Sequence, residues 1–91
     1  MVFRAVKDCR RTADEQRYIW ATLRVWPKLH QQRRTEIRAL IERVGRTPEE
    51  RRALYDLTVR GVPAEHTSRW SGIPVKQLYE LRREFYERFV I

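Results

Sequence analysis

The stretch GVPAEHTSRWSGIPVKQLYELRR, residues 61–83, decides the fold expected for the C-terminal half of the chain. It predicts a short helix, a turn at Gly72 and a second helix, because glycine accepts the positive backbone angle that a tight turn between helices requires. A small residue precedes that glycine and three apolar residues follow it, at the offsets where two crossing helices pack: Ser68, Ile73, Leu78 and Leu81. These offsets predict a helix-turn-helix.

Helical signals also cover most of the chain before this stretch. Thr12 and Glu15 form a capping-box pattern, and Thr47 and Glu50 repeat it. Apolar residues recur at spacings of three and four between such signals, as on the buried face of a helix. The expected helices begin at Thr12, about Lys28, Thr47, Pro63 and Pro74, the second ending at Val44 and the last at Phe89. The sequence predicts an all-α fold with about five helices, a C-terminal helix-turn-helix and no sheet.

The length of 91 residues fits a single helical domain, residues 1–91. Within it we expect N-terminal helices over residues 12–45 and the helix-turn-helix part over residues 47–91. Residues 1–11 show no period and are interpreted as a basic arm. The alternative is one short extended segment that contains three apolar residues, Val2, Phe3 and Val6.

The chain carries a formal net charge of +8, and seventeen of its twenty basic residues are arginine. Such an excess attracts polyanions, of which nucleic acid is the commonest. Residues 1–46 hold twelve basic and five acidic residues, whereas residues 47–91 hold eight and seven. We therefore expect the N-terminal half to supply much of the non-specific attraction.

Other functional classes have little support in the sequence. Cys9 is the only cysteine, and His30 and His66 are isolated, so neither an internal disulfide nor the usual zinc site is expected. No paired carboxylates or glycine-rich phosphate loop stand out, and we expect neither a cofactor nor an enzymatic activity. No apolar stretch is long enough for a membrane span and no secretory signal is recognised, which predicts a cytoplasmic protein without a membrane partner.

The sequence Gly72-Ile73-Pro74-Val75, with the short helix before it, resembles the helix-turn-helix of sigma-70 region 4. Residues 48–55 look like the helix that precedes this motif in the family, so the resemblance covers residues 47–83. Ser71 and Thr67 stand where the family prefers aliphatic residues, and Trp70 could fill the space beside Ser71. The whole layout is similar, more distantly, to small phage transcription activators of the ArpU/RinA type.

The resemblance implies sequence-specific binding to double-stranded DNA and transcription regulation, with the last helix in the major groove. The outward residues of that helix would read bases: Val75, Lys76, Gln77, Tyr79, Glu80 and Arg83. A second set of residues, six arginines and one histidine, would contact DNA phosphates: Arg60, His66, Arg69, Arg82, Arg33, Arg34 and Arg38. Lysine and arginine donate to guanine, and a glutamate accepts from cytosine.

Two other functions stay open. Region-4-like domains also contact RNA polymerase, so the chain could be a protein-interaction module. It could also be a non-catalytic, DNA-binding component of packaging or recombination machinery. A homodimer is a further hypothesis, because Trp20 lies off the first apolar stripe and the chain finishes with Phe89-Val90-Ile91.

Overall fold

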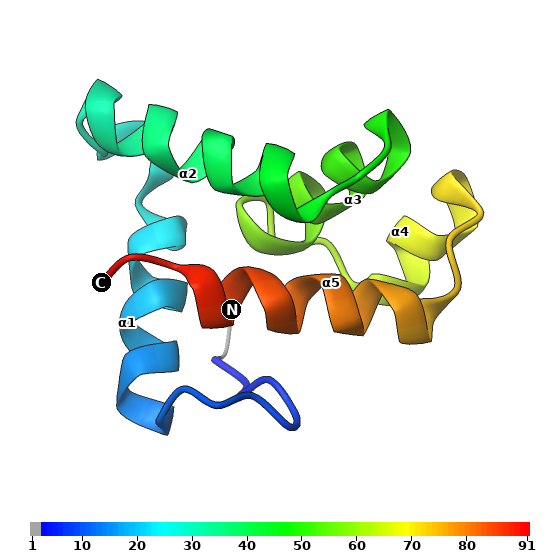
Figure 1. Cartoon of the computed structure of the whole chain (residues 1–91), viewed down its shortest axis with the longest axis horizontal. Helices are drawn as coiled ribbons and strands as arrows, with labels where there is room; N and C mark the ends of the chain where they lie inside the picture. Colours follow the sequence, from blue (N-terminus) through cyan, green and yellow to red (C-terminus); the bar gives the residue numbers. More distant parts are fainter. Residues whose placement is uncertain (1–2) are drawn as a thin grey trace.

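A computed structural model describes residues 3–91, which form five α-helices and one 3₁₀-helix, η1 (Figure 1). The elements in chain order are α1 (Ala13–Arg24), η1 (Trp26–Lys28), α2 (Gln31–Val44), α3 (Pro48–Thr58), α4 (Ala64–Ser71) and α5 (Val75–Arg88). None of the described residues lies in a strand. The predicted all-α class with about five helices is confirmed.

The predicted helix starts at the two threonines are confirmed. The Thr12 hydroxyl accepts the Glu15 N–H at 3.1 Å, and the Glu15 carboxylate accepts the Thr12 N–H at 3.0 Å. The bond from this N–H lowers the pKa of Glu15, since it stabilises the charged form. The Thr47 hydroxyl likewise accepts the Glu50 N–H at 3.1 Å, while the Glu50 carboxylate turns instead to the N–H of Arg46.

The junction between the first two helices differs from the prediction. Helix α1 ends at Arg24, and Trp26 belongs to η1 rather than to the first helix. Pro27 lacks the N–H that would continue the α-helical ladder, so the chain tightens into a 3₁₀ turn. Helix α2 therefore begins at Gln31 and not near Lys28, with the imidazole of His30 as its N-cap.

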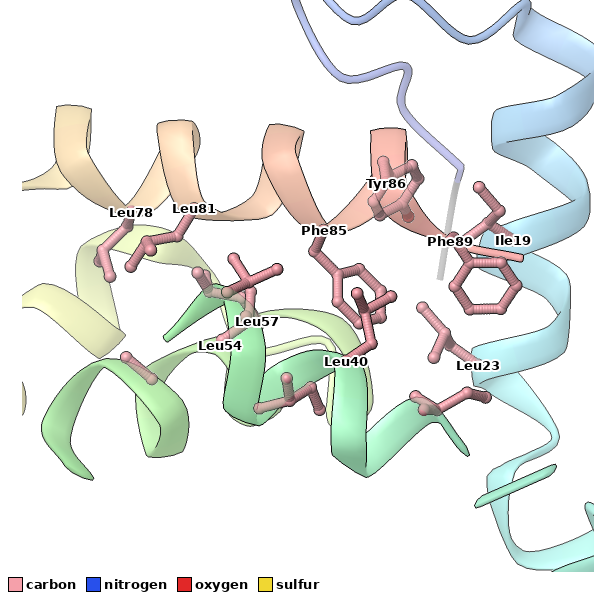
Figure 2. Packing of buried hydrophobic residues seen from close by; sticks show 14 of the residues in the cluster. Ile19, Leu23, Leu40, Leu54, Leu57, Leu78, Leu81, Phe85, Tyr86 and Phe89 are labelled. Carbon is pink, nitrogen blue, oxygen red and sulfur yellow. The ribbon is translucent and has the colours of Figure 1, made fainter. Parts of the chain in front are cut away.

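Helix α5 runs through the middle of the core. Figure 2 shows its first half beside the leucines of α3, its Phe85 beside Leu40 of α2, and its Phe89 beside Ile19 and Leu23 of α1. Phe85, Phe89 and Ile19 are fully buried. Each such side chain contributes about 1.5–3 kcal/mol relative to an exposed one. Because α5 packs against α2, α3 and α4, and Phe89 after it packs against α1, α5 is held firmly while its outer face stays open.

Arginine side chains satisfy the carbonyl groups at three helix C-termini. Arg11 donates to the carbonyls of residues 86, 87 and 89 at the end of α5. Arg24 donates to those of residues 58 and 59 at the end of α3, and Arg51 donates to that of Gly45 after α2 at 3.0 Å. Carbonyls at a helix C-terminus lack the full set of partners that helix interiors provide, and the negative end of the helix dipole favours a cation there.

The described part of the predicted basic arm packs on the body of the protein. Val6 is buried, and its N–H donates to the Gln16 side-chain oxygen at 2.6 Å. The Arg10 N–H donates to a carboxylate oxygen of Glu87 at 3.0 Å. The segment is thus an irregular strap that joins α1 to the end of α5, and the interpretation as an arm is corrected. Val2, part of the alternative extended segment, lies outside the described residues.

Candidate nucleic-acid interface

Helices α4 and α5 are joined by a three-residue turn whose geometry depends on Gly72. This glycine has φ of +74° and caps α4 by donating its N–H to the Ser68 carbonyl at 2.9 Å. A Cβ atom placed there would meet nothing within 4 Å, so the backbone angle rather than space requires glycine. The next residue, Ile73, is buried as predicted.

Serine hydroxyls fix the turn from inside. The Ser68 hydroxyl donates to the Ile73 carbonyl at 2.6 Å, and the Ser71 hydroxyl accepts the Ile73 N–H at 3.1 Å. Ser68 is half-buried, so it acts through this hydrogen bond as well as through its small size. The hydroxyl of the fully buried Thr67 donates to the Pro63 carbonyl at 3.3 Å, and the Ser71 hydroxyl donates to the Thr67 carbonyl at 2.7 Å. Trp70 does not fill the space beside Ser71, because 42% of its surface is exposed.

The predicted base-reading residues do not share one environment. Leu78 and Leu81 hold the inner face of α5 in the core, as predicted, which leaves the opposite face open. Lys76, Tyr79 and Glu80 are exposed there. The remaining three, Val75, Gln77 and Arg83, are more constrained.

Arg83 shares the side of α5 that carries Lys76, Tyr79 and Glu80, whereas Val75 and Gln77 lie toward its edges. Val75 is half-buried against the core, and Arg83 is half-buried. The Gln77 amide donates to the Glu50 carboxylate at 2.8 Å, so it is turned toward the start of α3. Reading of bases by Gln77 would require this hydrogen bond to break.

Part of the predicted phosphate set lies near this face. His66 and Arg69 are exposed on α4. Arg60, in the connection before α4, makes an ion pair of 3.1 Å with Asp56, whose side chain is 8% exposed. Its own side chain stays largely accessible, so the pair orients Arg60 without removing it from the surface.

Arg82 occupies the other edge of α5 and packs with aromatic rings. Its guanidinium lies 5.2 Å from the ring centre of Tyr79. Burial raises the pKa of the Tyr86 hydroxyl, while the positive charges of Arg82 and Arg24 act to lower it. Burial also lowers the pKa of Arg24, because a desolvated cation is disfavoured.

The α2 arginines are not brought together with this face. Arg33 donates to the Val90 carbonyl at 2.7 Å and lies over the Phe89 ring, and Arg38 lies over the Trp26 ring. Arg34, between them in sequence, is half-buried. The first half of α2 lies at the end of the molecule opposite α4 and the start of α5 (Figure 1). The predicted phosphate set is therefore divided between two ends of the protein.

The helices differ in how their N-termini are capped. Side chains of Thr12, His30 and Thr47 accept N–H groups at the starts of α1, α2 and α3. Helices α4 and α5 start after Pro63 and Pro74, and no side chain among residues 3–91 caps either one. The first N–H groups of a helix have no acceptor within that helix, and those of α4 and α5 lack a side-chain partner among the same residues as well.

One exposed pair was not anticipated from the sequence. The Arg52 guanidinium lies 4.7 Å from the ring centre of Trp70, joining the start of α3 to α4. The eighteen-residue separation gives no helical spacing that could have revealed it. Of the segments considered for dimerisation, Phe89 is part of the core, whereas Val90 and Ile91 are exposed. Trp20 is half-buried and packs edge-on against Phe3.

Comparison with protein-family models, with curated proteins and with solved structures gives no match. The resemblance to sigma-70 region 4 thus stays a prediction that depends on residues 47–83. Within residues 3–91, no three histidine, cysteine or acidic side chains gather as a metal site would need. Across the same residues, every helix is too short or too polar to cross a membrane.

Proposed function

We propose that this protein binds double-stranded DNA through α4, the Gly72 turn and α5, as a non-catalytic regulator of transcription. The observation that carries the proposal is the open face of α5. Lys76, Tyr79 and Glu80 are exposed there, while Leu78 and Leu81 fix the opposite face in the core. A rigidly held helix with one free polar face is what insertion into the major groove requires.

The chemistry of this face suits base edges. Residues 76, 79, 80 and 83 recur at helical spacing, so they lie along one side of α5. Lys76 and Arg83 can donate to guanine O6 and N7, and Glu80 can accept from the cytosine amino group. This face carries both positive and negative side chains. Because a carboxylate is repelled by the phosphates of the DNA backbone, such a face is better suited to contacts with particular bases than to uniform attraction to phosphate.

Contacts with the DNA backbone would come from α4 and from the two open helix N-termini. Helix N-termini bind phosphate through free N–H groups and the positive end of the dipole. His66 and Arg69 lie exposed on α4, the helix that precedes the turn into α5. The same groups would position α5 in the groove without specifying sequence.

Selection of bound duplexes from a random pool, followed by sequencing, tests the proposal. We expect one enriched motif. Lys76→Ala should then weaken binding to that motif about tenfold, equal to about 1.4 kcal/mol, and relax preference at one base pair. Lys28→Ala is the matched control, because Lys28 is an exposed lysine in η1, at the opposite end of the molecule. Equal losses from both variants, or no enriched motif, would contradict base reading by α5.

The candidate phosphate-contacting arginines lie at two ends of the protein, which allows a second test. Removing a phosphate contact should reduce the slope of log affinity against log salt by about 1. We expect this for Arg69→Ala on α4 and no change for Arg38→Ala on α2. A shallower slope for Arg38→Ala would mean that DNA also contacts the far end of the protein.

The exposed Trp70 favours a second candidate function, binding to another protein. Tryptophan and arginine are enriched among the residues that dominate protein interfaces, and Arg52 holds the Trp70 ring in place. RNA polymerase is the partner that the resemblance suggests. If this surface binds purified polymerase, Trp70→Ala should abolish that binding and leave DNA affinity unchanged. Polymerase binding that survives Trp70→Ala would remove this candidate.

A further inference from the structure

A polar cleft lies beside α5, and Tyr79 of the open face forms part of its wall. It has a volume of about 400 Å³ and lies between α1, the end of α3, the start of α4, α5 and the N-terminal strap. Its walls carry three aromatic side chains, from Trp20, Tyr79 and Tyr86. A cleft of this size lies within the range of small-molecule sites, about 300–1,000 Å³.

Cations dominate the lining. Arg4, Arg24 and Arg82 line the cleft together with only one carboxylate, that of Glu65. Arg24 is fixed by donating to the carbonyls of residues 58 and 59. The three elements that bring these arginines together are separate in sequence, so the excess of positive charge arises from the fold.

The hydrogen bonding of Arg82, one of the residues that line the cleft, is incomplete. Its Nε is buried and has no hydrogen-bond partner among the described residues. Buried N–H donors are nearly always paired in folded proteins, by protein groups, water or a ligand. The Tyr79 ring stacks near the same guanidinium and restrains its position.

We propose that this cleft binds a phosphomonoester of about the size of a nucleotide. Three guanidiniums against one carboxylate leave an excess of two positive charges, which matches the charge of about −1.5 to −2 on a phosphomonoester better than the single charge of a carboxylate. Guanidinium groups pair with phosphate oxygens in bidentate fashion. The aromatic walls would flank a flat ring attached to the phosphate. This inference does not depend on DNA binding.

The test follows the Arg82 Nε–H signal by nuclear magnetic resonance in the wild-type protein. Adenosine 5′-monophosphate and inorganic phosphate should shift this signal in a saturable way, and uncharged adenosine should not. A duplex oligonucleotide is titrated separately. If only the duplex moves the signal, the cleft holds a DNA phosphodiester and the proposal is wrong. An equal response to adenosine, or no response to either phosphate, also overturns it.

Substitution of Arg82 tests whether the nucleotide binds in this cleft. Arg82→Gln keeps the length and polarity of the side chain and should weaken binding of the nucleotide at least tenfold. Arg88→Gln is the control, because Arg88 is exposed on the same helix and pairs with Glu84 outside the cleft. Equal weakening by both variants would assign the effect to net charge and contradict a built site. The wild-type titration decides the question even if Arg82→Gln fails to fold.

Discussion

Two glycines in this protein are required for different reasons, and the difference can be measured. Gly72 has φ of +74° with open space around it, whereas Gly45 has φ of −81° and no room for a side chain. A Cβ atom on Gly45 would lie 2.8 Å from Arg51 Cγ and 2.9 Å from Arg51 N. The first position needs an unusual backbone angle, and the second needs a close approach between α2 and α3.

The expected magnitudes follow from these geometries. At Gly72, alanine should cost about 1–2 kcal/mol, the penalty of a left-handed backbone for a residue with a Cβ atom. Asparagine tolerates that backbone better, so Gly72→Asn should lose less stability than Gly72→Ala. At Gly45, the clash involves the backbone of Arg51, and Gly45→Ala should cost about 1–3 kcal/mol. Asparagine is larger still and should cost at least as much there.

Urea unfolding followed by far-ultraviolet circular dichroism measures the four variants, with equal m-values as the condition for comparing free energies. For a domain of this size each kcal/mol corresponds to about 4–8 °C in Tm. The asparagine variant should be the more stable of the two at position 72, and the alanine variant should be the more stable at position 45. Two results would contradict this explanation. One is a Gly72→Asn variant that is no more stable than Gly72→Ala, and the other is a Gly45→Asn variant that is more stable than Gly45→Ala.

Three further predictions concern buried polar groups. Gln16→Ala leaves the N–H of Val6 unpaired, and we expect urea unfolding to show a loss of about 1–3 kcal/mol. Arg24→Met removes a charged cap from the end of α3 and should cost about 1.5–3 kcal/mol, while the exposed control Arg17→Met should cost much less. Burial raises the pKa of Tyr86 above 10.0, so the folded state holds that proton more tightly than the unfolded state. The free energy of unfolding should therefore keep this contribution below pH 10.0 and lose it as the pH rises further, and Tyr86→Phe should show a smaller fall over that range.

The local features of the fold could be predicted because each depends on neighbours in sequence. The Thr12 and Thr47 caps, the positive φ of Gly72 and the buried Leu78 all follow from spacings of four residues or fewer, or from the period of the helix. The 3₁₀ turn after Val25 could not be separated from the preceding helix, because its apolar Trp26 continues the same stripe. The spacing of apolar residues indicates which face of a helix is buried. It does not indicate where the backbone hydrogen bonds change from the α-helical to the 3₁₀ pattern.

Long-range polar contacts could not be predicted, and these decide which candidate site residues are available. The sequence gives no sign that Gln77 reaches Glu50, twenty-seven positions away, or that Arg33 reaches Val90, fifty-seven positions away. Nor does it show that Gln16 holds the N-terminal segment in place. Such pairs depend on how the helices cross one another, and the crossing geometry is not evident from a single sequence.

Many of the arginines stabilise the fold by stacking on aromatic rings, so the net charge alone does not predict how many of them contact DNA. Six guanidiniums lie over aromatic rings within residues 3–91: those of Arg17, Arg24, Arg33, Arg38, Arg52 and Arg82. Strong contacts of this kind occur about once per 70–80 residues, so such a chain would ordinarily have one or two. A stacked guanidinium keeps its charge but is already positioned, and most of these lie away from the open face of α5. The long-range attraction to DNA should therefore reflect the whole charge of +8, whereas the salt slope should count only the few phosphates that α4 and α5 can reach.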